Sequence, residues 1–187
     1  MVARLIPLLF ASGACALCAE VIWMRRVALV AGSTGVAITL TLVGYMAGIG
    51  IGAAIGGRIR WRNAPRGYAL CELAAAAAVL AFPTALGAIP LTWPHEAILA
   101  GAAFVLAVPA TVHGLTLPAA SAALEGNDGV ATLYVANTAG AVLGSLLGPF
   151  LLLPAAGIRS TEWIVAGTLA VVADPTGAVV ALQKYPY

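Results

Sequence analysis

Long runs of apolar residues dominate the chain, and short polar, proline-containing or glycine-containing segments separate them. A helix that crosses a bilayer needs about 20 such residues. Because lipid offers no hydrogen-bond partner to backbone groups, these runs are predicted to be helices and not strands. The pattern predicts a single all-α domain over residues 1–187, a polytopic membrane protein of six transmembrane helices at about 4–24, 33–57, 67–89, 96–119, 131–153 and 161–182.

The composition also predicts a membrane-embedded chain. Hydrophobic residues make up 62% of the sequence and charged residues 9%, with a mean hydropathy of +1.02. Soluble domains carry about 25% charged residues. Six helices leave room for short loops only, so we expect no catalytic domain, no cofactor and no metal. The basic residues do not alternate with aromatic ones, so a nucleic-acid partner is not expected.

The basic residues predict an orientation. Four arginines follow the second run, and positively charged loops stay in the cytoplasm. Both termini are then expected inside, and three of the four tryptophans, Trp23, Trp93 and Trp163, near the outer interface. Six basic residues lie inside and three outside; the inside set is Arg4, Arg58, Arg60, Arg62, Arg66 and Lys184, and the outside set is Arg25, Arg26 and Arg159.

Glycines recur every fourth residue in the second and fifth runs. Such spacing makes a flat groove that lets another backbone approach closely. Each stripe alone is also typical of ordinary packing between membrane helices. Together they occupy the second helix of two triplets of opposite orientation, which predicts a 3+3 inverted repeat like that inside each half of a major-facilitator transporter. The stripes are Gly44, Gly48, Gly52 and Gly56, then Gly140, Gly144 and Gly148.

Ionisable residues inside apolar runs are candidate sites, because each costs about 2.5–3.5 kcal/mol at a helix centre. Glu20 lies about one turn inside the first helix and is about 140° around it from Arg25. It is expected either to reach lipid headgroups, or to form a fixed ion pair with a group on another helix or contact a substrate. Glu72 is expected to pair with an arginine of the second loop, or else to bind a solute.

Asp174 precedes Pro175 in the sixth run, and two interpretations stay open. A proline inside a helix frees carbonyl groups, and a broken helix with an acid at mid-depth is typical of ion sites. Alternatively the helix ends near Val172, and residues 174–187 form a tail.

Three further groups of polar residues are candidates. His113 is expected to make a packing hydrogen bond, or to contact a solute. Tyr134 and Asn137 are expected to join helices, or to form the polar wall of a cavity. Cys15 and Cys18 form a C-x-x-C pair, but a redox motif needs an accessible thiolate. Their apolar flanks favour simple packing.

Several motifs resemble one protein family. The first helix carries S-G-x-x-A at Ser12 and E-x-x-W-x-R at Glu20, and the second ends in G-G-R at Gly56. The fifth carries L-Y-V-A-N-T-A-G-A-V-L-G over 133–144. These stretches, within about 10–160, resemble the membrane domain of the fused major-facilitator-like and spermidine-synthase-like bacterial proteins.

The resemblance implies a half-size major-facilitator-like unit in a bacterial inner membrane, with membrane lipids around it. It implies a small organic solute, with a polyamine cation suggested by the family alone. No residue matches the family's aminopropyltransferase domain, so its activity is not carried over. A half unit leaves a face uncovered, which predicts a homodimer or a second membrane subunit. The alternatives are an accessory subunit that docks through the glycine stripes, and an anchor for a separate aminopropyltransferase.

Overall fold

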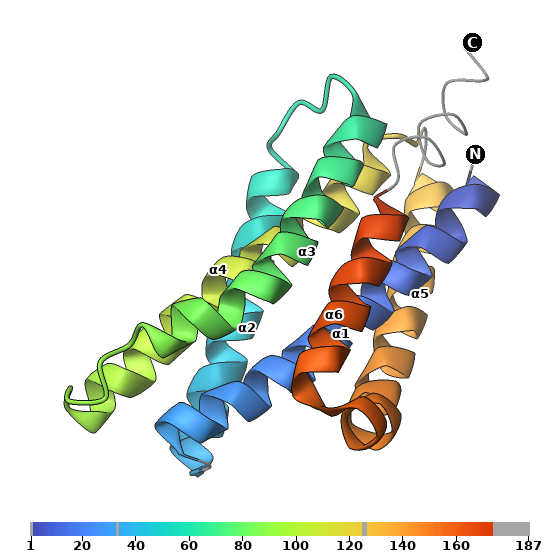
Figure 1. The fold of residues 1–187 in the computed structure, drawn as a ribbon. Coiled ribbons are helices and arrows are strands. Elements are labelled where there is room, and N and C mark those ends of the chain that lie inside the picture. The colour runs from blue at the N-terminus through green and yellow to red at the C-terminus, as the bar shows by residue number, and fades with distance from the viewer. Residues whose placement is uncertain (1, 33, 125–126, 174–187) are drawn as a thin grey trace.

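The computed structural model describes residues 2–32, 34–124 and 127–173, and all of their regular secondary structure is helical. The structure therefore confirms the all-α prediction for these residues. Figure 1 shows the helices as a bundle in which successive helices run in opposite directions. They are α1 (Val2–Ala31), α2 (Gly35–Gly56), α3 (Ala64–Gly87), α4 (His95–Ser121), α5 (Asn127–Leu147), a π-helical turn η1 (Gly148–Leu152) and α6 (Leu153–Val172).

Within the described residues, five helical segments are long and apolar enough to cross a membrane. Four of them correspond to α1–α4, and the fifth, Gly129–Val172, contains α5, η1 and α6. The last two predicted helices are therefore joined by helical residues where a loop was expected. The chain reverses at Gly157, whose φ of 75° and ψ of 171° lie in a region that is essentially reserved for glycine.

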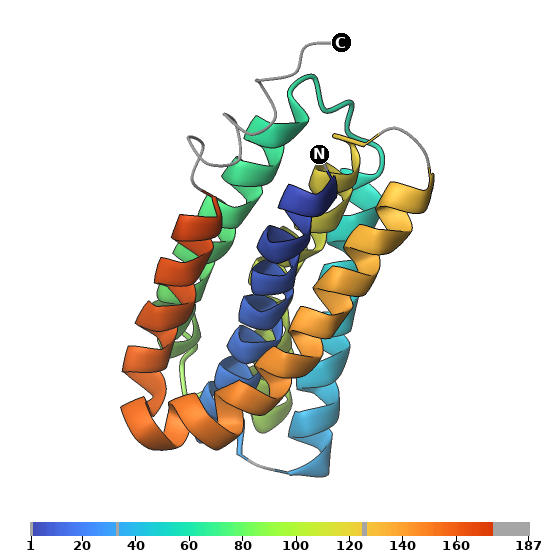
Figure 2. The same cartoon turned by 90° about the vertical axis from the view of Figure 1, so that its right-hand side faces the viewer.

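The six helices form two rows of three. Figure 2 shows α6, α1 and α5 in one row, with α3, α4 and α2 behind them. Within the rows, α1 packs against α5 and α6, and α4 packs against α2 and α3. Between the rows, α1 meets α4 and α3 meets α6. The helices α1 and α4 are thus the central pair.

The glycines of α2 allow its backbone to touch that of α4. A Cβ atom added at Gly44 or Gly52 would lie 2.7 or 2.1 Å from the carbonyl oxygen of Ala103 or Thr111. Only glycine has the space for such an approach, because any side chain would overlap the neighbouring main chain.

The glycines of α5 meet α1 in the same way. A Cβ atom at Gly140 would lie 1.9 Å from the carbonyl oxygen of Phe10, and one at Gly144 would lie 2.0 Å from that of Ala14. Both glycine stripes are therefore filled by helices of the same chain. The expectation that a partner docks through these stripes is wrong, because α4 and α1 already occupy them.

The first helix continues past its expected end near residue 24 to Ala31, so Arg25 and Arg26 lie within the helix and not in a loop. Trp23 is fully buried, so its indole packs against other helices of the bundle. Trp93 and Trp163 are exposed. The described part of α6 ends at Val172, and Asp174 lies outside the described residues.

Candidate functional site

Buried polar side chains lie between the helices at several levels of the bundle. Such groups are costly to bury unless they are paired, so their partners indicate which of them are structural and which are available for a ligand. Among the described residues they are Ser12, Glu20, Thr41, Glu72, His113, Thr116, Thr161 and Glu162.

The contact between α1 and α3 encloses Glu72, whose exposed fraction is 0%. The Ser12 hydroxyl donates a hydrogen bond of 2.6 Å to its Oε1 atom. Its Oε2 atom has no hydrogen-bond partner in the described part of the chain. The arginines of the second loop do not reach it, so the expected pairing of Glu72 with one of them is wrong. The loop lies beyond the end of α2, whereas Glu72 points from α3 into the interior toward α1.

The surroundings of Glu72 are polar but carry no positive charge. Tyr68 lies one helical turn earlier on α3, with its buried hydroxyl beside the carboxylate and likewise lacking a hydrogen-bond partner among the described residues. Cys15 and Cys71 also lie near the carboxylate. These side chains and Ser12 form what we call the Glu72 cluster. Because an isolated carboxylate is strongly disfavoured in an apolar interior, the cluster is suited to a cation or a proton.

A second group surrounds Trp23 at the centre of the bundle. Its ring lies 5.2 Å from that of Phe82, 6.4 Å from that of Tyr45 and 5.6 Å from that of His113, centroid to centroid. The ring nitrogens Trp23 Nε1 and His113 Nε2 have no hydrogen-bond partner within the described residues. The packing hydrogen bond expected of His113 is therefore absent at Nε2, and an edge-on aromatic contact holds the ring instead.

Glu20 is buried near Tyr45, at the side of α1 that faces α2. Because its side chain is buried, it does not reach lipid headgroups as one interpretation expected. Arg25 is exposed and forms no ion pair in the described structure, which agrees with the angle between the two residues on the helix. Glu20 and Arg25 therefore do not belong to one site.

An ion pair that the sequence analysis missed joins α1 to α6. Arg26 donates from Nε and Nη2 to the two carboxylate oxygens of Glu162, the second bond measuring 2.7 Å. The side chains are 23% and 4% exposed. Such a two-pronged pair fixes the geometry of both groups. The available signal was the opposite charge of Glu162 and Arg26, which the predicted topology places at the same end of the bundle.

The predicted polar residues of α5 lie on different sides of that helix. Tyr134 is 59% exposed. Asn137 is half-buried at the crossing with α1, where Gly13 packs against its main-chain and side-chain carbonyl oxygens. The structure therefore does not bring Tyr134 and Asn137 together with Glu72.

The comparisons with known proteins identify no relative. No protein-family model, no curated protein and no solved structure matches the chain. The function is therefore inferred from the geometry of the chain itself. The Glu72 cluster is the site with a fully buried charge-bearing group and an unused acceptor atom. Within the described residues, no three His, Cys, Asp or Glu side chains come close enough together to hold a metal ion.

Proposed function

We propose that the chain is a six-span, half-size major-facilitator-like unit of a bacterial inner membrane that binds or moves a small organic cation. The observation that carries this proposal is Glu72, a fully buried carboxyl group with the Ser12 and Tyr68 hydroxyls beside it and no basic partner among the described residues. Acidic groups buried between membrane helices without a fixed positive partner are typical of substrate and proton pathways.

The helix contacts support an inverted repeat of α1–α3 and α4–α6. Exchanging α1 with α4, α2 with α5 and α3 with α6 converts the α2–α4 contact into the α5–α1 contact. The glycine positions obey the same exchange. Gly44 contacts Ala103, and Gly140 contacts Phe10. The two glycines are 96 residues apart in the sequence, and the two residues that they contact are 93 apart.

The same register holds one and two turns further along. Gly48 and Gly52 meet Ala107 and Thr111, whereas Gly144 and Gly148 meet the corresponding residues of α1, Ala14 and Cys18. A shift of 93 residues also relates Glu20, a buried acid of α1, to His113, a buried histidine of α4. Inverted-repeat transporters bind their substrates near the midplane at the repeat interface.

The cationic nature of the solute follows from charge. Glu72 and Glu20 are buried acids, and neither is paired with a basic side chain in the described part of the chain. An organic ammonium group would both neutralise such a carboxylate and donate to its free oxygen. A polyamine is proposed on the family resemblance alone.

A second copy of the chain would complete the solute path. The outward faces of α2 and α5 are exposed over most of their length, and Tyr134 and Thr138 project from α5 on that side. Tyrosine and threonine on an otherwise apolar face favour a protein neighbour or an aqueous cavity over lipid tails. We therefore propose a homodimer in which these residues face the path.

Uptake into proteoliposomes tests the function. The wild-type chain is expected to accumulate radiolabelled spermidine, or another amine from a panel of organic cations, in a saturable manner. Glu72→Gln keeps the size of the side chain and the bond from Ser12 but removes the charge. Because a hydrogen bond to a charged group contributes about 1.5–3 kcal/mol, uptake at low substrate should fall about tenfold or more.

Glu96→Gln is the matched control. Glu96 lies exposed in the first turn of α4, so its replacement should leave uptake unchanged. Gel filtration of both variants checks that they remain folded. Saturable uptake that is equal in the wild type and in Glu72→Gln would refute the role of Glu72. The absence of flux for every cation in the panel, with a folded protein, would refute the transport proposal.

A further inference from the structure

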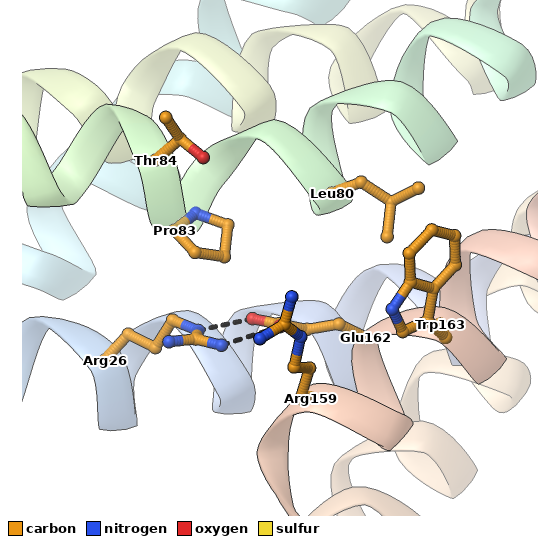
Figure 3. Close-up of a pocket in the computed structure, with 7 residues that line it drawn as sticks. All are labelled: Arg26, Leu80, Pro83, Thr84, Arg159, Glu162 and Trp163. Atoms are coloured by element: carbon orange, nitrogen blue, oxygen red, sulfur yellow. Dashed lines mark hydrogen bonds and ion pairs between the residues drawn. The ribbon is translucent and has the colours of Figure 1, made fainter.

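A pocket of about 340 Å³ opens at the end of the bundle opposite the N-terminus, between α1, α3 and α6. The Arg26–Glu162 ion pair is part of its lining, and Figure 3 shows the two bonds of that pair as dashed lines. Its volume is at the small end of the range of ligand pockets, about 300–1,000 Å³, which suits a headgroup-sized ligand. The lining residues are Arg26, Leu80, Pro83, Thr84, Arg159, Glu162 and Trp163.

The charges around this pocket do not cancel. Two guanidinium groups and one carboxylate line it, which leaves one positive charge in excess. Glu162 accepts two hydrogen bonds from Arg26, so both its oxygens are engaged. Arg159, one turn before Glu162 on α6, makes no hydrogen bond or ion pair to any described residue. Its guanidinium fork is therefore available to an oxyanion, the ligand that matches its geometry.

The rest of the lining is apolar or amphipathic. Leu80 and Pro83 of α3 form one wall, and the Trp163 indole of α6 forms another. Trp163 is 61% exposed. Indole rings concentrate at the level of lipid headgroups, and arginines near helix ends reach the same level. A phosphate beside Arg159 would therefore have an apolar surface next to it on which the start of an acyl chain can lie.

We propose that this pocket binds the phosphate of an anionic membrane phospholipid, with Arg159 as the principal ligand and the Arg26–Glu162 pair holding the pocket in shape. This assignment also gives a role to Arg26 and Arg159, two of the three arginines that the positive-inside rule leaves outside the cytoplasm. It is independent of the cation proposed at Glu72, because the two sites differ in charge and in their lining residues.

Lipid binding is measured by native mass spectrometry of the full chain in detergent, titrated with phosphatidylglycerol or with phosphatidylcholine. The wild type should retain phosphatidylglycerol in preference to phosphatidylcholine. Arg159→Gln should lower the retained phosphatidylglycerol at least threefold, and Arg159→Lys should lower it less. Arg25→Gln is the matched control, because Arg25 is exposed near the same end of the bundle but does not line the pocket.

Glycerol 3-phosphate at millimolar concentration separates the two sources of a phosphate group. If it leaves the phosphatidylglycerol adducts in place, the ligand is the lipid. If it displaces them from the wild type but has no effect on the residual adducts of Arg159→Gln, the pocket binds free phosphate esters, and its lipid assignment is overturned. Equal loss of lipid in Arg159→Gln and Arg25→Gln would overturn the site itself, since it would show attraction by surface charge alone.

Discussion

A methyl group added at Gly144 would occupy space that α1 already fills. The new Cβ atom would lie 2.0 Å from the carbonyl oxygen of Ala14, 2.7 Å from its carbonyl carbon and 2.8 Å from its Cα atom. Carbon and oxygen atoms in the closest favourable contacts are about 3.3 Å apart. Because the contacted atoms belong to a helix backbone and cannot rotate away, α1 and α5 must separate locally by roughly 1.3 Å.

The free energy of unfolding should fall in Gly144→Ala. Overpacking of a tight interface costs about 1–3 kcal/mol. Alanine is favoured over glycine inside a helix by about 0.5–1 kcal/mol, which offsets part of that cost. The expected net loss is about 0–2.5 kcal/mol relative to the wild type, and about 1–3 kcal/mol relative to a glycine-to-alanine change in open space. Gly167→Ala is the control, because a Cβ atom there has no neighbour within 4 Å and only the helix preference remains.

Unfolding by sodium dodecyl sulfate in mixed micelles, followed by circular dichroism, measures both variants against the wild type. Gly167→Ala should be as stable as the wild type or slightly more so. Gly144→Ala should unfold at a lower detergent fraction. Equal stability of the two variants would refute the inference that glycine is required for the approach of α5 to α1.

Two further substitutions test the end of the bundle where α1 meets α6. Glu162→Gln leaves the half-buried guanidinium of Arg26 without its charge partner, so the same unfolding assay should show a loss of about 1–3 kcal/mol. Adding Arg26→Gln to this variant should recover part of the lost stability. If the losses of the two single variants simply add in the double variant, the two side chains do not form a direct pair. Gly157→Ala places a side chain at a φ of 75°, so the free energy of unfolding should fall by about 1–3 kcal/mol although the space around the residue is open. A stability equal to that of Gly167→Ala would show that the chain reversal at this position tolerates other residues.

The helices were largely visible in the sequence, because the length of an apolar run is a local property. The end of α1 could not be predicted in this way. Arg25 and Arg26 marked an apparent boundary, yet the helix continues to Ala31. Arg26 is neutralised by Glu162, 136 residues away, and such a pairing becomes visible only when α6 is placed beside α1.

The candidate site was also predictable only in part from the sequence. Glu72 was recognisable as an acid inside an apolar run, but its partner Ser12 lies 60 residues earlier and resembles any small residue of a helix interface. The glycine stripes were equally recognisable. The sequence did not reveal that α4 and α1 fill them, because glycine spacing indicates a close approach and not the identity of the approaching helix.

The pairing of α2 with α4, and of α5 with α1, has a consequence for synthesis of the chain. Helices emerge from the ribosome in order, yet each glycine stripe is matched by a helix from the other triplet. When α1–α3 alone have been made, the stripe on α2 has no α4 against it, and the complementary surface of α1 has no α5 against it. The first three helices therefore lack their closest packing partners until α4 and α5 have been made, and we expect the two halves of the chain to fold as one cooperative unit.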